Sequence, residues 1–221
     1  QNDNGDGDRY EKVPLAGLGL AVRDDEEEVL VDPIGLAIWL YKPHVLKILL
    51  HYHRPTVDAL FLAIKRAAPT CLQVLFHHGA SVASRDTDRN TLFHVIAEGV
   101  PGDETVQMLQ ILIKQAGNSL QKLLSMQTSK GGFTPLHLAC EAGNVVLIEA
   151  MMASGSVSMW RKLTRLEDDE GRTPLLAAID ADCTEAVMTL LMWRRSFDVA
   201  STSGTKPTPN PYAWSPREFV N

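Results

Sequence analysis

Residues 132–143 read GFTPLHLACEAG, and residues 171–178 repeat the first half of this stretch as GRTPLLAA. Both copies place Gly-x-Thr-Pro before an apolar run, and a second apolar segment follows each run. A threonine at such a position caps a helix by accepting hydrogen bonds from unpaired backbone amides. The proline after it suits the first helical turn, where its missing N–H would have no partner anyway. The pattern therefore predicts a unit of two short helices that occurs more than once.

Three weaker copies precede these two in the same register. They start at Asp32, Asp58 and Thr91, so that successive starts are 26, 33, 43 and 39 residues apart. A half-copy at residues 210–215 begins 37 residues after Thr173. Spacings of this size are typical of solenoids, in which each unit buries its open hydrophobic face against the next unit. We therefore expect one cooperative array.

The Thr-Pro-Leu-His-Leu-Ala motif resembles the ankyrin repeat, a unit of about 33 residues with two helices and a β-turn. The resemblance covers residues 32–200. It implies an all-α ankyrin-repeat solenoid of about five repeats plus a partial C-terminal repeat. It also implies that His94 and His137 bond to the backbone of the neighbouring turn. The motif is similar to repeats of IκB-type inhibitors and Notch-type nuclear regulators, but so many ankyrin proteins share it that it selects no subfamily.

Two spacings exceed that of the usual repeat and indicate insertions. The extra residues fall in three ranges: 100–105, 118–130 and 156–167. The last range joins one repeat to the next, so we expect it to lengthen the hairpin finger that ankyrin repeats have there. Insertions in solenoids often lie on the binding face. The short first spacing indicates a shortened finger at residues 53–57.

The 221 residues carry a net charge of −6 that is unevenly spread. Residues 1–32 contain ten acidic and three basic residues, whereas the rest of the chain is nearly neutral. A nearly neutral body argues against direct nucleic-acid binding, which needs clustered Lys and Arg. No apolar run reaches the roughly 18 residues of a membrane span, and no basic-then-apolar leader precedes the acidic segment. We therefore expect no membrane insertion.

The three cysteines are odd in number and far apart, which favours free thiols in a reducing compartment. We expect a cytoplasmic or nuclear protein. The sequence predicts three parts: an acidic N-terminal segment, partly disordered and capping the array (1–31), the repeats (32–200), and a linker with the partial repeat (201–221).

Two metal hypotheses fail on geometry. Residues 2–13 resemble a calcium loop, but the twelfth position, which should hold a bidentate acid, is Val13. Histidines 51, 53, 77 and 78 cluster in the sequence, but equivalent positions on adjacent repeats are about one helix diameter apart. Ligands must come within about 2 Å of a shared ion. We therefore expect no metal and interpret these residues as helix-end histidines (His51, His53, His77 and His78).

Cys140 lies one helical turn from His137 and invites a comparison with a nucleophilic dyad. A dyad also needs an orienting third group and an oxyanion hole, and the sequence offers neither. Phosphate-binding glycine loops and zinc-protease motifs are missing as well. We therefore expect no enzyme, no catalytic residue and no cofactor.

The remaining candidate is a surface. The resemblance implies a concave face built from the fingers and the outward positions of the first helices. Aromatic and charged residues at such positions favour partner contact. The predicted partner-binding residues of this face are Trp39, Lys65, Asp88, Asn90, Lys130, Phe133, Glu141, Arg172 and Asp180; its fingers add Thr87, Asp169 and Glu170.

The insertion at 156–167 adds Trp160, Arg161 and Arg165 to this set. Tryptophan and arginine are enriched at interface hot spots. The alternative is that Trp160 folds back onto the second helix and closes the loop, and the sequence leaves both readings open.

We expect a protein-interaction module, a scaffold or regulator within a larger intracellular protein, that presents a rigid surface at little entropic cost. The partner would be another protein or another part of the same chain. The alternative is an intramolecular regulatory or assembly domain of a channel or multidomain enzyme. A third reading is a structural link to membrane or cytoskeleton. The acidic segment could also bind in cis to the basic insertion.

Overall fold

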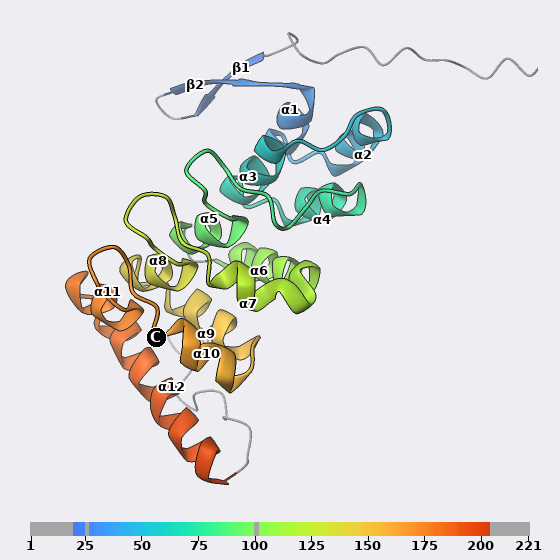
Figure 1. The fold of residues 1–221 in the computed structure, drawn as a ribbon. Helices are drawn as coiled ribbons and strands as arrows, with labels where there is room; N and C mark the ends of the chain where they lie inside the picture. Colours follow the sequence, from blue (N-terminus) through green and yellow to red (C-terminus); the bar gives the residue numbers. More distant parts are fainter. Residues whose placement is uncertain (1–19, 25–26, 100–101, 204–221) are drawn as a thin grey trace, which may run out of the picture.

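The computed structural model describes residues 20–24, 27–99 and 102–203, and of residues 20–31 and 196–203 only the backbone. The described part is a stack of helix pairs with a two-stranded hairpin at its N-terminal end (Figure 1). The sequence did not predict this hairpin, in which β1 (Leu20–Asp24) pairs antiparallel with β2 (Glu27–Val31). The half-copy at 210–215 and the calcium-like stretch at 2–13 lie outside the described residues.

The fold class is all-α, because the hairpin stands outside the helical stack. The helix pairs are α1 (Pro33–Trp39) with α2 (Pro43–Tyr52), α3 (Val57–Lys65) with α4 (Pro69–His77), α5 (Leu92–Glu98) with α6 (Asp103–Ala116), α8 (Pro135–Glu141) with α9 (Val145–Ala153), and α11 (Pro174–Asp180) with α12 (Thr184–Ser203). Shorter elements lie between pairs: η1 (Gly117–Ser119), α7 (Leu120–Leu124) and α10 (Val157–Leu163).

The first helices begin where the repeat pattern places a capping residue. The Asp32 carboxylate accepts from the Gly35 amide at 2.6 Å, and Pro33 opens α1. The register of the second unit needs a correction. Its cap is Thr56, whose hydroxyl accepts from the Ala59 amide, and not Asp58. Only residues 53–56 connect α2 to α3, so the finger predicted at 53–57 is indeed short.

The helix pairs stack in sequence order. The first helices contact one another from α1 through α3, α5 and α8 to α11, and the second helices do so from α2 through α4, α6 and α9 to α12. One hydrophobic cluster runs through the stack from Ile34 to Trp193. The array is therefore a single core and not a row of separate domains.

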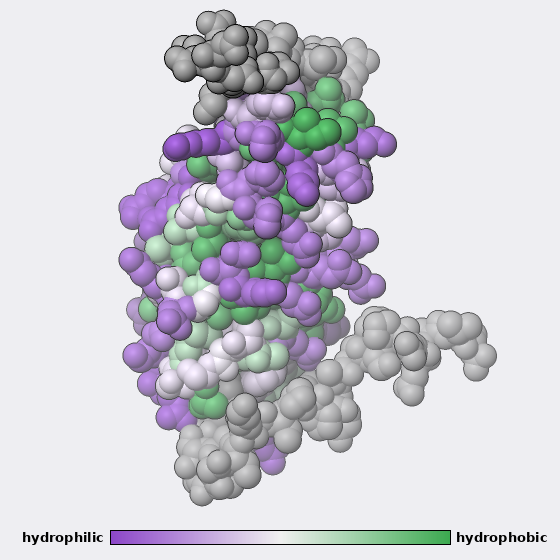
Figure 2. Space-filling view, turned by 90° about the vertical axis from the view of Figure 1, so that its right-hand side faces the viewer, coloured by the Kyte–Doolittle hydropathy of each residue, from purple (hydrophilic) through white to green (hydrophobic). Residues whose placement is uncertain are grey.

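The N-terminal end of the stack leaves apolar side chains uncovered. Val45, Ile48 and Tyr52 lie on one side of α2, and Ile48 is 63% exposed. Val74, which occupies the equivalent place on α4, packs against the core. Figure 2 shows hydrophobic residues near this end and a second group of them across the middle of the same face, with polar residues on either side.

Two expectations about the irregular segments were wrong. Residues 156–167 do not lengthen a finger, because most of them form α10, which packs beside α9 (Figure 1). The linker expected from residue 201 does not begin there, since α12 continues to Ser203. The insertion at 118–130 similarly contains the end of η1 and all of α7.

Candidate functional site

Three loops extend from the stack on the side of the first helices (Figure 1). We call them the first finger (residues 80–90), the second finger (126–133) and the third finger (165–172). Each finger is bonded to the next. The Ser129 amide donates to the Asp88 carbonyl at 3.0 Å, and the Asp169 amide donates to the Gly131 carbonyl at 3.0 Å. The fingers therefore form one continuous, hydrogen-bonded edge.

Side chains strengthen both junctions between fingers. The Ser129 hydroxyl donates to the Asp88 carbonyl at 2.7 Å. The Gln127 amide donates to the Gly132 carbonyl and to the Glu167 carbonyl, at 2.8 and 2.7 Å. Because several bonds converge on each junction, the fingers hold a defined shape before any partner binds.

The two motif histidines fasten the fingers to the helices, as the resemblance implies. The Nδ1 atoms of His94 and His137 accept from the backbone amides of Thr91 and Thr134. The proton therefore sits on Nε2. His94 Nε2 faces the carbonyls of Met126 and Phe133, at 3.1 and 3.0 Å, and His137 Nε2 faces the Arg172 carbonyl at 2.9 Å. Each histidine thus ties its helix to the following finger.

Burial governs the protonation of these histidines. Both side chains are fully buried. Burial lowers the pKa of His94 to about 4, although the carbonyls of Phe133 and Met126 oppose this shift. Burial also lowers the pKa of His137. Both rings are therefore neutral at physiological pH, and their role is structural.

The third finger is organised around a buried carboxylate. Asp168 accepts from the backbone amides of Glu170 and Arg172 and from the Arg172 guanidinium, each at 2.8 to 2.9 Å. Burial alone would raise the pKa of Asp168, but the bonds from Arg172 and Glu170 outweigh it and lower the pKa. Arg172 also reaches Asp180 at 2.6 Å and lies 5.7 Å from the Phe133 ring centroid.

The structure brings several of the predicted residues together. Lys130 Nζ lies 3.3 Å from the Asp88 carboxylate, and both side chains stay exposed, at 87% and 54%. Phe133, Arg172 and Asp180 form a second group. Phe133 is half-buried and not a freely exposed anchor. Asn90 is also turned inward, because its backbone and side-chain amides both donate to the Asp86 carboxylate.

The ends of the first helices form a second row beside the fingers. Trp39, Lys65, Glu141 and Asp180 occupy the same place in their repeats, two residues before the turn inside the helix pair. That turn has a positive φ at Tyr41, Ala67, Gly143 and Asp182. The Arg66 guanidinium lies 4.1 Å from the Trp39 ring centroid, so this aromatic is partly covered by a cation. The row therefore runs from a basic, aromatic end to an acidic end.

Glu98 belongs to this row and escaped the sequence analysis. It follows Thr91 by seven residues, as Glu141 follows Thr134, so the register could have found it. Burial, together with the carboxylates of Asp86 and Glu141, raises its pKa, while Lys65 opposes the shift. Glu98 and Lys65 line a cavity of about 530 Å³, with Tyr41 and Arg66 at the same opening.

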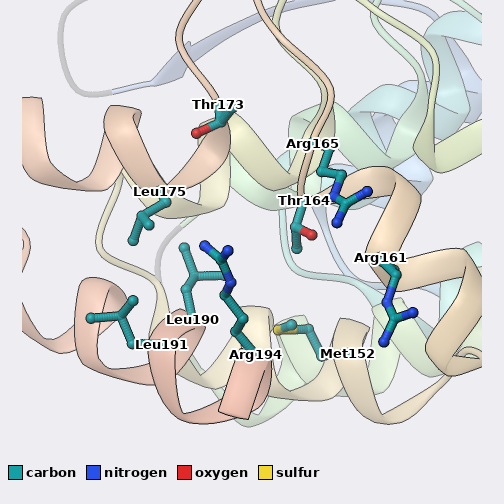
Figure 3. A pocket seen from close by; sticks show the side chains of 9 residues that line it. All are labelled: Met152, Arg161, Thr164, Arg165, Thr173, Leu175, Leu190, Leu191 and Arg194. Atoms are coloured by element: carbon teal, nitrogen blue, oxygen red, sulfur yellow. The ribbon is translucent and has the colours of Figure 1, made fainter. Parts of the chain in front are cut away.

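Trp160 is a correction to the predicted site. Its side chain is completely buried, so it is a core residue of α10 and offers no surface to a partner. The alternative of local packing is the one that the structure shows. Arg161 and Arg165 are exposed and line a cavity together with residues of α12 (Figure 3). Arg161 lies on α10, apart from the fingers, whereas Arg165 begins the third finger.

The described residues form neither a nucleophilic dyad nor a metal site. The Cys140 thiol is fully buried, and burial raises its pKa to about 12, so it stays protonated. Both ring nitrogens of His137 are already bonded elsewhere. No three His, Cys, Asp or Glu side chains in this part of the chain converge as metal ligands, and His77 pairs edge-on with His78. None of the described helices is long and apolar enough to span a membrane.

Comparison with known proteins bears on this architecture. A sequence family described as ankyrin repeats (3 copies) matches residues 104–202, which span nearly all of α6 and α12 and the helices between them. The chain contains ankyrin repeats. The helices before this range, α1 to α5, continue the same stack toward the N-terminus.

Curated relatives match weakly and over a short length. Transient receptor potential cation channel subfamily V member 6 of Rattus norvegicus is 25% identical over 124 residues, which cover 56% of this chain and 15% of that protein. Subfamily V member 5 is 27% identical over 89 residues in Rattus norvegicus and in Mus musculus, covering 40% of this chain and 12% of each relative. The chain thus corresponds to a small part of each relative.

Proposed function

We propose that this chain is a protein-recognition module whose ankyrin fingers and first-helix ends hold a segment of another polypeptide. One observation carries the proposal, namely that the three fingers are bonded into one edge while Asp88 and Lys130 remain exposed on it. Because hydrogen bonds already fix the shape of this surface, it can bind a partner without a large loss of conformational entropy. The recognised segment would carry charges of both signs, because the edge presents both.

The buried environment of the polar groups supports binding over catalysis. His94, His137 and Asp168 form their hydrogen bonds inside the fold, and these bonds fix the fingers. The exposed charges lie at the edge, where a partner can reach them. We place the protein in the cytoplasm or nucleus, because its three cysteines are free.

A charge swap tests the finger surface. The double variant Asp88→Lys/Lys130→Asp keeps an ion pair between the fingers but reverses the charges that a partner meets. We expect it to retain the wild-type melting temperature and to lose the proteins that the wild type captures from cell extract. Lys122→Glu is the matched control, since Lys122 is exposed on α7 outside the fingers. Equal capture by the swap and the wild type would contradict the proposal.

A second candidate function is an intramolecular one, as a regulatory or assembly domain of a cation channel. The observation that favours it is the match to two members of transient receptor potential subfamily V. In this case the partner of the fingers is another part of the same polypeptide. The coding sequence on both sides of these residues decides the point. Membrane-spanning segments downstream would support the channel, and a reading frame without them would exclude it.

A further inference from the structure

A cavity of about 400 Å³ lies between the fourth and fifth helix pairs, beside the ends of the third finger (Figure 3). Cavities of this size are typical of small-molecule sites. The wall divides by chemistry into an apolar floor, two hydroxyls and three arginines. The lining residues are Met152, Leu175, Leu190 and Leu191, then Thr164 and Thr173, then Arg161, Arg165 and Arg194.

The insertion in the fourth repeat builds this cavity. Arg161 is on α10, Arg165 follows its end, and Arg194 comes from α12 on the other side. The buried Trp160 fixes α10 in the core, and the Thr164 hydroxyl donates to the Trp160 carbonyl at 2.9 Å. The arginines at the end of α10 are thereby held on a rigid element. A shorter repeat without α10 would have no cavity of this kind.

The positive charge of the cavity wall favours an anionic ligand. The guanidiniums of Arg165 and Arg194 line it, and no acidic side chain is among the described residues of its wall. Arginine matches phosphate through parallel hydrogen bonds, and it is hydrated weakly enough to lie beside apolar surface. Figure 3 shows Arg194 beside Leu190 and Met152, Arg165 beside Thr164, and Arg161 on the far side of Met152, where its side chain points away from the other two.

The apolar part of the cavity wall favours a ligand that carries a hydrocarbon group. Met152 and Leu190 are almost fully buried, while Leu191 is 45% exposed at the mouth. An apolar group placed here would cover Leu191 and the half-buried Leu175, which favours binding in proportion to the area covered. A simple inorganic anion would leave that surface exposed to water.

We propose that this cavity binds a phosphate-type anion carrying a hydrocarbon group, either a free amphiphile or the headgroup region of an anionic lipid. The phosphate would lie between Arg165 and Arg194, and the hydrocarbon would lie on Leu175 and Leu191. This site shares no finger side chain with the proposed function except Arg165, at the start of the third finger. If the cavity does not bind such a ligand, the proposed recognition function of the fingers is unaffected, and the reverse also holds.

Calorimetric titration of the full 221-residue chain tests the pairing of charge with hydrocarbon. The probes are octyl phosphate, inorganic phosphate and octyl glucoside, each kept below micelle formation. We expect octyl phosphate to bind at least about tenfold more tightly than either of the other two, which each lack one half of the chemistry. Affinity for octyl phosphate no greater than that for inorganic phosphate would overturn the proposal.

Matched variants locate the site. Arg165→Gln and Arg194→Gln should each weaken octyl phosphate binding about tenfold, because each removes a charged donor. Lys162→Gln and Arg195→Gln remove neighbouring exposed charges that do not line the cavity, and should leave the affinity unchanged. Equal losses at positions 194 and 195 would show binding to general positive charge and would overturn the proposal. Melting temperatures verify that all four variants are folded.

Flotation with vesicles separates the two sources of the ligand. Vesicles of phosphatidylcholine with phosphatidic acid are compared with vesicles of phosphatidylcholine alone. Binding that requires phosphatidic acid and is lost in Arg194→Gln assigns the site to a membrane lipid. Octyl phosphate binding without vesicle binding assigns it to a free amphiphile. Capture of an acidic peptide, with no affinity for octyl phosphate, would overturn the proposal in favour of a protein contact.

Discussion

At the scale of single residues, a few buried polar groups determine the shape of the exposed surface. His94 and His137 each accept from their own helix cap and donate to the next finger. Their roles were predictable, because the Thr-x-x-His spacing and the family resemblance together imply them. The burial of Trp160 was not predictable, since a tryptophan in an insertion fits both a surface anchor and a core residue.

The first prediction concerns the pH dependence of stability. The folded state holds the His94 pKa at about 4, below its ordinary value near 6.5. Between these values the unfolded chain binds a proton that the folded chain excludes. The free energy of unfolding should therefore fall as pH drops from 6.5 to 4, with His94 contributing up to about 1.4 kcal/mol per pH unit, and His137 adding to the slope.

Urea unfolding at several pH values, for the wild type and His94→Gln, measures this contribution. The variant should show a shallower loss of stability between pH 6.5 and 4 than the wild type, whatever its stability at pH 7. The other ionisable groups are common to both proteins and cancel in the difference. Parallel curves would mean that His94 does not resist protonation in the folded state.

The second prediction concerns Trp160. Because its side chain is fully buried, Trp160→Ala should lower the free energy of unfolding by about 3–5 kcal/mol through lost burial and a cavity. Lys162→Ala, two residues along α10 and exposed, should change it by less than about 0.5 kcal/mol. Urea denaturation measures both. Similar small losses in the two variants would place Trp160 at the surface and restore it as a candidate for partner contact.

At the scale of elements, the sequence predicted the helix pairs better than the segments between them. The first helices begin at their capping residues because the Thr-Pro pattern is local chemistry. The insertion at 156–167 was expected to be a loop, yet Ser156 caps a new helix, and Met159, Trp160 and Leu163 bury one face of it. That outcome depends on an open apolar surface beside α9, which spacing alone does not reveal.

The third prediction tests the junction between the second and third fingers. Gly132 has a φ of +63°, and a Cβ there would lie 2.4 Å from the Asp169 carboxylate and 2.9 Å from the Asp169 amide nitrogen. Gly171 has a φ of +75°, but a Cβ there would meet nothing within 4 Å. Both alanine variants incur left-handed backbone strain of about 1–2 kcal/mol. Gly132→Ala must also push the third finger away.

We therefore expect Gly132→Ala to be more destabilising than Gly171→Ala by about 1 kcal/mol, the size of a lost hydrogen bond. Hydrogen exchange of the Asp169 amide should accelerate only in Gly132→Ala, because that amide bonds to the Gly131 carbonyl. If the two variants lose the same stability and leave this amide equally protected, then the fingers are not held together as described.

At the scale of the whole molecule, one continuous core carries a hydrogen-bonded row of fingers on one side. The stack follows from the repeat register, so the array could be predicted from sequence, and the weak copies before residue 104 fall into place in the structure. The bonds between fingers could not be predicted, because they join residues about 40 positions apart, such as Ser129 with Asp88. The recognition surface is therefore a property of the assembled stack.

The proposal that the finger edge is the recognition surface is best tested by site-specific photo-crosslinking in living cells. A photoreactive amino acid is placed at position 130 on the second finger or at position 122 on α7, both of which are exposed. We predict a partner protein, or a second segment of the parent polypeptide, crosslinked at position 130 and not at position 122. A crosslink of the same species at position 122, with none at position 130, would contradict the proposal.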